Sequence, residues 1–578
     1  MQRSTTHAVI AIFVGMLDVL LATPAHAQYS ADFQTNIISG VTSNWSGDYI
    51  VGYTNSADVL LIQDGGVLSN GNGSIGPNTS STNTVIVSGS GSVWDNGAGL
   101  VIGNGSGFNN MSVDNLLIIT NGGAVYSVGG VVGDYYGANN TVLVTGTGSV
   151  WSNAGNLSVG GFVYSKNNSL IIADGGAVYN NDAAFARGQF SGQETALVTG
   201  SGSVWHTGTL LLGGASTLTI TNGGVVNSSS SSIDGGGGNT VLVTGKGSMW
   251  NSGSMKIEGE FANSLIISDG GTVYSSDVLV RGGFSNDQLL VTGSGSVWDI
   301  QTALALEGPP SVSLTVSNGG TVIAGDVEAL VATFIALSGG SLYVTNGSGT
   351  GSLQVNNGSL TFNSGTLATR ATAINNGSVF TVGDGDGAAT FIMEPGGSGF
   401  HSFANGLTIS SNAVLKGVGT VIGSTTVNPG GTLSPGDAPG SITFSNSLTL
   451  APGSIFTVEL DGAGEGQYSR LVGFDTLSVS NSILSVALGY TPSAGDTFTI
   501  ISNLSATAVL GTFVDPDGTA LTEGAEFVVD GTTFQIDYTA NADGQDVVLT
   551  ALIPEPSSLL LASLAALLLC PLLKRRRA

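Results

Sequence analysis

A short phrase of glycines, small residues and one aromatic residue recurs along the chain, and this recurrence constrains the fold more than any other feature. One form, Ser/Thr-Gly-x-Gly-Ser-Val/Met-Trp, ends at Trp94, Trp151, Trp205, Trp250 and Trp298. A second form, Asn/Asp-Gly-Gly-x-Val-Tyr, ends at Tyr126, Tyr179 and Tyr274. The marks from Trp45 to Tyr343 recur about every 25 residues, a period typical of solenoids. Repeats of this kind bury a hydrophobic face only by stacking on one another.

The runs between these phrases indicate β-strands. They are short and rich in β-branched residues, as in Val-Leu-Val and Leu-Ile-Ile. Each is followed by Gly-Gly or Gly-x-Gly, which breaks helices and allows a corner. We therefore predict an all-β fold, a right-handed parallel β-helix with two or three strands in each coil. The hand follows from the usual hand of parallel β crossovers.

The repeat also predicts which side chains face inward. Residues 115–126 align without a gap on residues 140–151, which places Tyr126 and Trp151 in one slot. The residue before that slot, such as Val204, is apolar at each mark, so we assign it to the interior. Neighbours in a strand point in opposite directions, so the aromatic slot is expected to face outward. The resulting aromatic ladder would contain Trp94, Tyr126, Trp151, Tyr179, Trp205, Trp250, Tyr274 and Trp298. The alternatives are that loops cover these rings or that the rings pack in the core, since tryptophan is usually buried.

A second repeated slot holds asparagine at the start of a strand. Its members are Asn83, Asn115, Asn140, Asn168, Asn239 and Asn263. Stacked amides at this slot would hydrogen-bond along the axis. The alternative is that asparagine only favours the turn.

Composition narrows the classes of partner. The 578-residue chain has a formal net charge of −26 and only 9% charged residues. Its cations outside the two chain ends are Lys166, Arg187, Lys246, Lys256, Arg281, Arg370, Lys416 and Arg470. Because these few cations cannot form a basic patch, we expect no nucleic acid partner. The single cysteine, Cys570, lies in the tail, so the body has no disulfide.

The N-terminal residues 1–27 are typical of a signal peptide. Arg3 precedes a mostly apolar run over 8–22, and Ala25-His26-Ala27 forms an A-x-A cleavage site. We therefore predict processing by signal peptidase, with Ala25 and Ala27 as cleavage-site residues, and export through the inner membrane. A permanent membrane anchor is the alternative.

The wording of the repeat resembles the repeats of autotransporter passengers and of PEP-CTERM proteins. The likeness rests on Gly-x-Gly-Ser-Val-Trp alternating with Gly-Gly-x-Val-Tyr, and it implies a β-helical fold. We divide the body into regular coils of about 25 residues over 28–345, less regular coils over 346–450, and terminal coils with a β cap over 451–553. A cap is expected because the last coil otherwise exposes an unpaired edge.

The C-terminal residues 554–578 resemble the PEP-CTERM sorting signal. This signal consists of a Pro-Glu-Pro motif, a short hydrophobic helix and a basic end. The motif is Pro554, Glu555 and Pro556, and the basic end is Lys574, Arg575, Arg576 and Arg577. The resemblance implies cleavage by exosortase near the motif. The uncharged run over 559–573 would extend about 22 Å as a helix, short of the roughly 30 Å hydrocarbon core. The basic end would stay in the cytoplasm and hold the chain transiently in the inner membrane. A permanent tail anchor is the alternative.

Residues for chemistry are sparse. His206 and His401 each stand without a partner at motif spacing, and the acidic residues are scattered in turns. Calcium ligands are conceivable at 384–386 and 515–518, but neither segment has the full calcium-loop pattern. We expect no catalytic residue, metal site or cofactor.

These observations favour an exported structural or adhesin-like protein of the cell envelope, surface or extracellular matrix, with a role in biofilm. Its expected ligand is extracellular polysaccharide, which would stack on the outward aromatic rings. The alternatives are a carbohydrate-active β-helix enzyme, a polysaccharide lyase or hydrolase, and a spacer without ligand.

Overall fold

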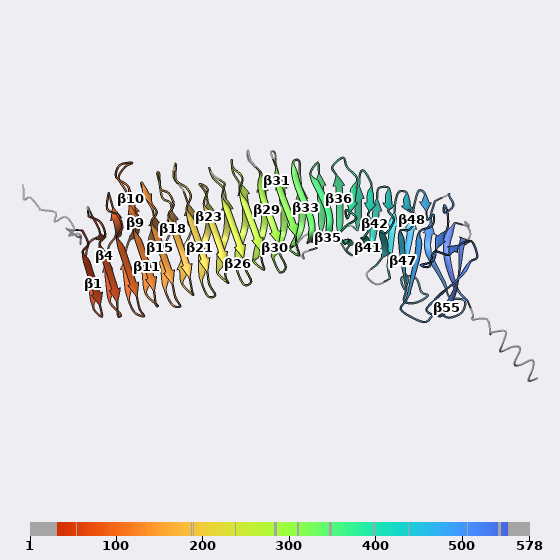
Figure 1. Cartoon of the computed structure of the whole chain (residues 1–578), viewed down its shortest axis with the longest axis horizontal. Helices are drawn as coiled ribbons and strands as arrows, with labels where there is room; N and C mark the ends of the chain where they lie inside the picture. The colour runs from red at the N-terminus through yellow and green to blue at the C-terminus, as the bar shows by residue number, and fades with distance from the viewer. Residues whose placement is uncertain are drawn as a thin grey trace, which may run out of the picture.

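Each strand of the repeat pairs in parallel with the equivalent strand one coil earlier and one coil later. Leu116, for example, lies opposite Thr84 of the preceding coil and Thr141 of the following coil. The computed structural model describes residues 32–552 except 54, 187, 189, 237, 283–285, 309–310, 346–349, 397–398, 437–438, 506 and 541–544. These residues form about 17 turns of a solenoid, roughly 80 Å long at a coil spacing of about 4.8 Å. Figure 1 shows the resulting rod, with the first and last described residues at opposite ends.

The coils build three parallel sheets. The first sheet contains β1 (Thr35–Ser39), β4 (Val59–Gln63), β7 (Thr84–Ser88), β11 (Leu116–Thr120), β15 (Thr141–Thr145), β18 (Ser169–Ala173), β21 (Thr195–Thr199), β23 (Thr217–Thr221), β25 (Thr240–Thr244), β27 (Ser264–Ser268), β29 (Asp287–Thr292), β31 (Val312–Ser317), β37 (Phe380–Val382), β40 (Leu407–Ile409), β43 (Thr425–Val427), β46 (Leu448–Leu450) and β49 (Leu477–Ser478). The second contains β2 (Thr42–Asn44), β5 (Val67–Asn70), β8 (Val93–Asn96), β12 (Ala124–Ser127), β16 (Val150–Asn153), β19 (Ala177–Tyr179), β38 (Ala389–Met393), β41 (Ala413–Gly417), β44 (Thr432–Pro435), β47 (Ile455–Leu460), β50 (Ile483–Leu488) and β52 (Phe513–Val514).

The third sheet contains β3 (Tyr49–Val51), β6 (Gly73–Pro77), β9 (Gly99–Asn104), β13 (Gly129–Val132), β17 (Leu157–Val159), β20 (Ala183–Phe185), β34 (Ser352–Asn356), β36 (Ala371–Asn375), β39 (Phe400–Phe403), β42 (Gly419–Ile422), β45 (Ser441–Phe444), β48 (Arg470–Gly473) and β51 (Thr497–Asn503). Six strands run from the second sheet into the third: β22 (Val204–Leu212), β24 (Val225–Ile233), β26 (Met249–Glu258), β28 (Thr272–Arg281), β30 (Val297–Glu307) and β32 (Thr321–Ala329). Two run from the first into the second: β33 (Thr333–Val344) and β35 (Ser359–Thr369).

Antiparallel strands follow the parallel coils at the C-terminal end. β56 (Asp546–Ala551) pairs with β51 and β55 (Thr532–Ala540), β54 (Glu526–Val529) pairs with β55, and β53 (Ala520–Leu521) pairs with β52. A small pair, β10 (Ser112–Val113) with β14 (Gly137–Ala138), lies in the corner loops near the other end. The prediction of an all-β parallel solenoid is confirmed, and the described residues contain no helix. Accordingly, none of them forms a helix with the length and hydropathy that a membrane crossing requires.

The predicted residues of the two chain ends lie outside the described part of the chain. They are the cleavage-site residues Ala25 and Ala27, the sorting motif Pro554, Glu555 and Pro556, and the basic end Lys574, Arg575, Arg576 and Arg577.

The two forms of the repeat are turns of different length, which the gapless alignment missed. Strand pairing places Thr120 opposite Thr145, but Val125 opposite Trp151. Three residues, 121–123, connect one pair of strands, whereas four residues, 146–149, connect the other. One extra residue moves every following side chain to the opposite face. Tyr126 therefore lies opposite Ser152, not Trp151.

Local chemistry explains both turns. In the shorter turn, Gly123 leaves no room for a side chain, because a Cβ there would lie 2.4 Å from the Val87 carbonyl oxygen. In the longer turn, Gly146 and Gly148 have positive φ values of 87° and 84°, which only glycine adopts without strain. Ser149 then donates a hydrogen bond to the Thr145 carbonyl at 2.7 Å and accepts one from the Gly122 amide at 3.0 Å. Each long turn thus holds the short turn of the preceding coil.

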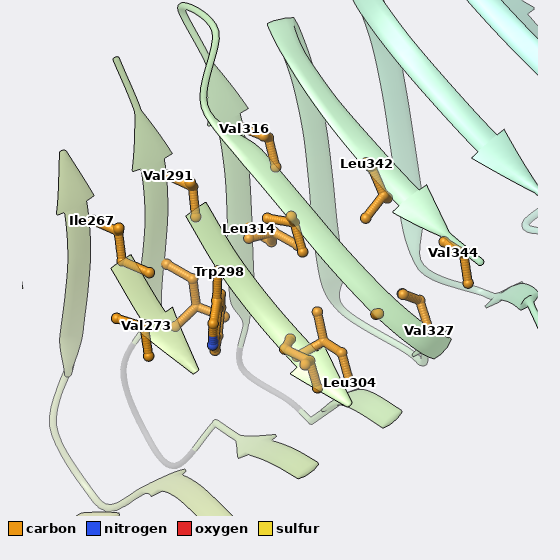
Figure 2. Packing of buried hydrophobic residues seen from close by; sticks show 14 of the residues in the cluster. Ile267, Val273, Val291, Trp298, Leu304, Leu314, Val316, Val327, Leu342 and Val344 are labelled. Carbon is orange, nitrogen blue, oxygen red and sulfur yellow. The ribbon is translucent and has the colours of Figure 1, made fainter. Parts of the chain in front are cut away.

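The outward orientation predicted for the tryptophans is wrong. All five are 0% exposed, namely Trp94, Trp151, Trp205, Trp250 and Trp298. Figure 2 shows the Trp298 side chain among apolar side chains of neighbouring strands, inside the coil. In the same inward column, each tryptophan alternates with a smaller residue such as Val125 or Val226. This alternation gives each indole space between two smaller side chains.

Four of the five buried indole N–H groups donate to a residue on the preceding coil, whereas the Trp151 indole N–H has no partner among the described residues. Trp94 donates to Asn70 at 2.7 Å, Trp205 to Asn180 at 2.8 Å, Trp250 to Ser228 at 3.1 Å and Trp298 to Ser275 at 3.1 Å. A buried N–H without a partner would cost about 1–3 kcal/mol. At these four positions, a polar residue one coil earlier therefore offsets the cost of burying the indole N–H.

The residue before the aromatic slot is predicted to face inward, and this is wrong for one of the two forms of the repeat. The cause is again the difference in turn length. In the short-turn coils this residue is buried, as predicted, at Val125, Val178, Val226, Val273, Val322 and Leu342. In the long-turn coils it faces outward and is half-buried, at Val93, Val150, Val204, Met249 and Val297.

The asparagine slot forms a buried hydrogen-bonded ladder along the axis, which confirms the first of the two interpretations. Side-chain Nδ2 donates to the Oδ1 of the next coil from Asn83 to Asn115 at 2.8 Å, from Asn115 to Asn140 at 2.9 Å, from Asn140 to Asn168 at 2.9 Å, and from Asn239 to Asn263 at 3.0 Å. The same oxygens also accept the backbone N–H of the earlier coil. The ladder satisfies buried polar groups that would otherwise destabilise the coil.

Carboxyl groups occupy three slots of this ladder. Asp58 is 0%, Glu194 0% and Asp287 1% exposed. The Glu194 carboxyl accepts the Asn168 backbone N–H at 2.6 Å, and its other oxygen has no partner among the described residues. Burial raises the pKa of Glu194 to about 8 and that of Asp287 to about 6. Burial also raises the pKa of Asp58. Desolvation favours the neutral acid in each case.

We expect Val226→Asp to destabilise the rod by several kcal/mol, because it leaves an unpaired charge in the apolar column. Val204→Asp, on the adjacent coil but facing outward, should cost about 1 kcal/mol or less. Denaturant midpoints of the two variants test this difference. Equal midpoints would contradict the assigned orientation.

Stability should also fall as pH rises. Because the pKa of Glu194 is raised in the folded state, its contribution is complete below about pH 4.5 and is lost as pH passes through about 8. Glu194→Gln keeps an uncharged group that accepts the Asn168 N–H. The variant should therefore match the parent near pH 4 and exceed it by a few kcal/mol near pH 8.5.

Denaturant unfolding at both pH values measures this effect. Glu328→Gln, at an exposed position, removes the same charge and serves as the control. A pH dependence of Glu194→Gln as steep as that of the parent would contradict the assignment.

Candidate functional site

The outer face of the second sheet carries three exposed tyrosines in one column. Tyr126, Tyr179 and Tyr274 are 44%, 41% and 39% exposed. We call them the tyrosine stripe. Successive coils of the same column hold Asp95, Ser152, His206, Asn227, Asn251 and Asp299. The stripe is the outward part of the predicted aromatic ladder.

The neighbours of these tyrosines decide which ring faces are open. Tyr126 lies between Asp95 and Ser152, neither of which carries a ring. Tyr179 instead stacks on His206 with ring centroids 5.1 Å apart and planes 8° apart. His206 is thus an exposed strand residue paired with an aromatic ring.

A second aromatic cluster, which the repeat did not reveal, lies in the corner loops that lead from the third sheet to the first. Tyr136 and Tyr164 stack at 5.4 Å, Tyr164 and Phe190 stack at 4.9 Å, and Phe108 packs on Tyr164 at 4.3 Å. Each such pair contributes about 0.5–1.5 kcal/mol. These ring faces cover one another, so this corner stack holds the loops together more than it offers a platform. Its sequence signal is the presence of one or two aromatic residues in each of four successive loops, outside the repeated phrase.

A separate ring pair lies on the same loops. Tyr135 and Phe162 stack at 5.4 Å with planes 9° apart, and Phe162 remains 60% exposed. Asp134 lies beside this pair, near the backbone N–H groups of Tyr135 and Phe162. Burial raises the pKa of Asp134, and these N–H groups offset part of the rise.

Two adjoining cavities lie along the third sheet beside Phe162. The larger, about 490 Å³, is lined by Gly99, Leu100, Val101, Gly129, Gly130, Val131, Asn156, Leu157, Ser158, Gly161 and Phe162. The smaller, about 200 Å³, is lined by Asn156, Leu157, Asp182, Ala183, Ala184, Thr209 and Leu211. Since these residues belong to successive strands β9, β13, β17, β20 and β22, the combined axial groove runs along the rod.

Within the described part of the chain, His206 and His401 share no cluster with carboxylates. His401 is fully buried, its Nδ1 lies 3.1 Å from the Thr372 hydroxyl, and burial lowers its pKa to about 4. It is therefore neutral near pH 7. Asp182 is the one carboxylate among the residues that line the axial groove.

The two acidic segments considered for calcium are closed turns. Asp384 Oδ1 accepts the backbone N–H of Asp386 at 3.0 Å, and Asp515 Oδ1 accepts that of Thr519 at 2.7 Å. The hydrogen bonds at Asp384 lower its pKa. No three His, Cys, Asp or Glu side chains of the described residues gather as metal ligands.

The fold places the chain among the parallel β-solenoid proteins. No family model matches the chain. No curated protein matches it either. A solved structure with some likeness is the hyper-glycosylated fragment 55–350 of TibA, whose glycosylation is catalysed by TibC. The two share 12% identity over 83% of this chain and 100% of that chain, with a TM-score of 0.18. This likeness is too weak to carry an argument about function.

Proposed function

We propose that the chain is an exported, non-catalytic rod of the cell envelope, surface or extracellular matrix, with an adhesin-like role. The observation that carries this proposal is the tyrosine stripe, which lies on the outer face of a continuous solenoid. Tyrosine rings that alternate with Asp, Ser and Asn along an axis suit a polysaccharide, because sugar rings stack on aromatic faces and their hydroxyls bond to polar side chains.

The two chain ends support the proposed route of export and processing. The A-x-A site at Ala25 and Ala27 supports cleavage by signal peptidase. The Pro-Glu-Pro motif, the uncharged run over 559–573 and the basic end support transient insertion in the inner membrane and processing by exosortase.

The proposal includes a right-handed coil and a C-terminal cap. The usual hand of parallel β crossovers supports the first. The second is supported by the antiparallel strands β53–β56, which cover backbone groups that a free last coil would expose.

Processing can be tested by intact-mass measurement of the protein from its own host. The mature chain should begin near residue 28 and end near residues 554–556. Replacing Pro554, Glu555 and Pro556 with alanine should keep the tail on the chain and hold it in the membrane fraction. Wild-type protein that retains its tail at full length would contradict the exosortase step.

Polysaccharide binding can be tested with the triple variant Tyr126→Ala/Tyr179→Ala/Tyr274→Ala. Loss of three stacking faces should weaken retention on the host's extracellular polysaccharide by at least about tenfold. Phe334→Ala removes a 51% exposed ring elsewhere on the rod and should bind like the parent. Equal retention of the triple variant and the parent would remove the tyrosine stripe as a ligand site.

A further inference from the structure

We propose that the axial groove beside Phe162 is a binding site for a neutral glycan chain, which would lie parallel to the rod axis. The biological use of this site rests on the proposed surface role. The binding itself is a property of the folded coils and does not involve the tyrosine stripe.

The floor of the groove is formed by glycines, which have no side chains to fill it. Gly99 and Gly129 lie opposite each other on adjacent coils, in the column that holds Asn156 one coil later. A Cβ on Gly99 would meet its nearest atom only at 3.7 Å, so the backbone does not require glycine there. Glycine at this position therefore matters because it leaves open volume, and not because it allows a turn conformation.

One wall is aromatic. Phe162 lines the larger cavity and is 60% exposed, although large exposed rings are unfavourable in water. Tyr135 stacks on the ring of Phe162, with ring centroids 5.4 Å apart and planes 9° apart. The ring is therefore positioned before any ligand arrives, which reduces the entropy cost of binding. Phe162 is the side chain expected to stack on a sugar ring.

Polar groups accompany this wall on the same face. Asn156 lines both cavities, and Asp182 and Thr209 continue the column on the next two coils. Asp182 Oδ1 accepts the Thr209 backbone N–H at 2.8 Å, so the carboxylate is fixed in place. The Ser158 hydroxyl also lines the groove, is buried, and has no partner among the described residues. An apolar groove with a few fixed polar groups is typical of ligand sites.

Charge and strand pairing narrow the ligand class. Neither cavity is lined by Lys, Arg or His, and the chain carries a net charge of −26. An anionic polysaccharide would therefore be repelled. An extended peptide would need an unpaired strand edge, but β13 and β17 are paired on both sides. A neutral chain with many hydroxyl groups fits both conditions.

The spacing of the coils favours a polymer over a single sugar. Equivalent positions recur about every 4.8 Å along the axis, close to the length of one residue in an extended glycan. Asn156, Asp182 and Thr209 occupy consecutive coils in one column. Successive sugars can therefore meet successive polar side chains.

The test uses the purified full-length protein and calorimetric titration with neutral hexasaccharides of β-linked glucose, xylose and mannose, and with hexagalacturonate as the anionic probe. At least one neutral hexasaccharide should bind, and hexagalacturonate should not. Phe162→Ala should weaken that binding about tenfold. Gly99→Leu, which fills the groove, should abolish it.

The matched control is Phe261→Ala, which removes a 48% exposed phenylalanine from a corner loop several coils away and should bind like the parent. The triple tyrosine variant should also keep hexasaccharide binding, which separates the groove from the tyrosine stripe. If Gly99→Leu unfolds, the surface variant Phe162→Ala decides alone.

The proposal is overturned if no neutral hexasaccharide binds the parent, if Phe162→Ala binds like the parent, or if hexagalacturonate is the preferred probe. Each of these results leaves export and processing untouched, so this inference can fail separately from the proposed function.

Discussion

Parallel hydrogen bonding between successive coils is the constraint on which the rest of the structure depends. It fixes the distance between equivalent residues, so any side chain repeated in the sequence becomes a column along the rod. The side chains of a buried column must then find their packing and hydrogen-bond partners within the rod. The asparagine column does so by amide-to-amide hydrogen bonds. The tryptophan column alternates large and small residues, and four of its five indoles donate to the preceding coil.

Turn length then decides what each column displays. A strand alternates its faces with every residue, so one extra residue in a turn exchanges inside and outside. The four-residue turn sends Trp151 inward, whereas the three-residue turn leaves Val125 inward and Tyr126 outward. Two nearly identical phrases thus serve opposite purposes. One fills the core, and the other supplies the exposed rings on which the proposed surface role depends.

The outer faces differ in chemistry because the corner loops differ in length. The second sheet carries separate tyrosines between polar residues on its outer face. The longer loops after the third sheet fold back and place Phe162 beside the strand glycines, which produces a groove. Within those loops the corner stack uses its ring faces internally, so exposure of an aromatic residue alone does not identify a platform. The neighbour on the adjacent coil decides whether a face is free.

The sequence by itself determined the solenoid, its period and the parallel strands, because each follows from local residue patterns repeated at a fixed interval. It marked the asparagine slot but left a ladder and a turn preference open, and the pairing of the coils decided for the ladder. It did not determine which aromatic residues face outward, since that required the count of residues in each turn within the paired coils. It also did not predict that Phe162 and Gly99 line the same groove. These residues are 63 positions apart and share no motif, and only the stacking of coils brings them to one groove.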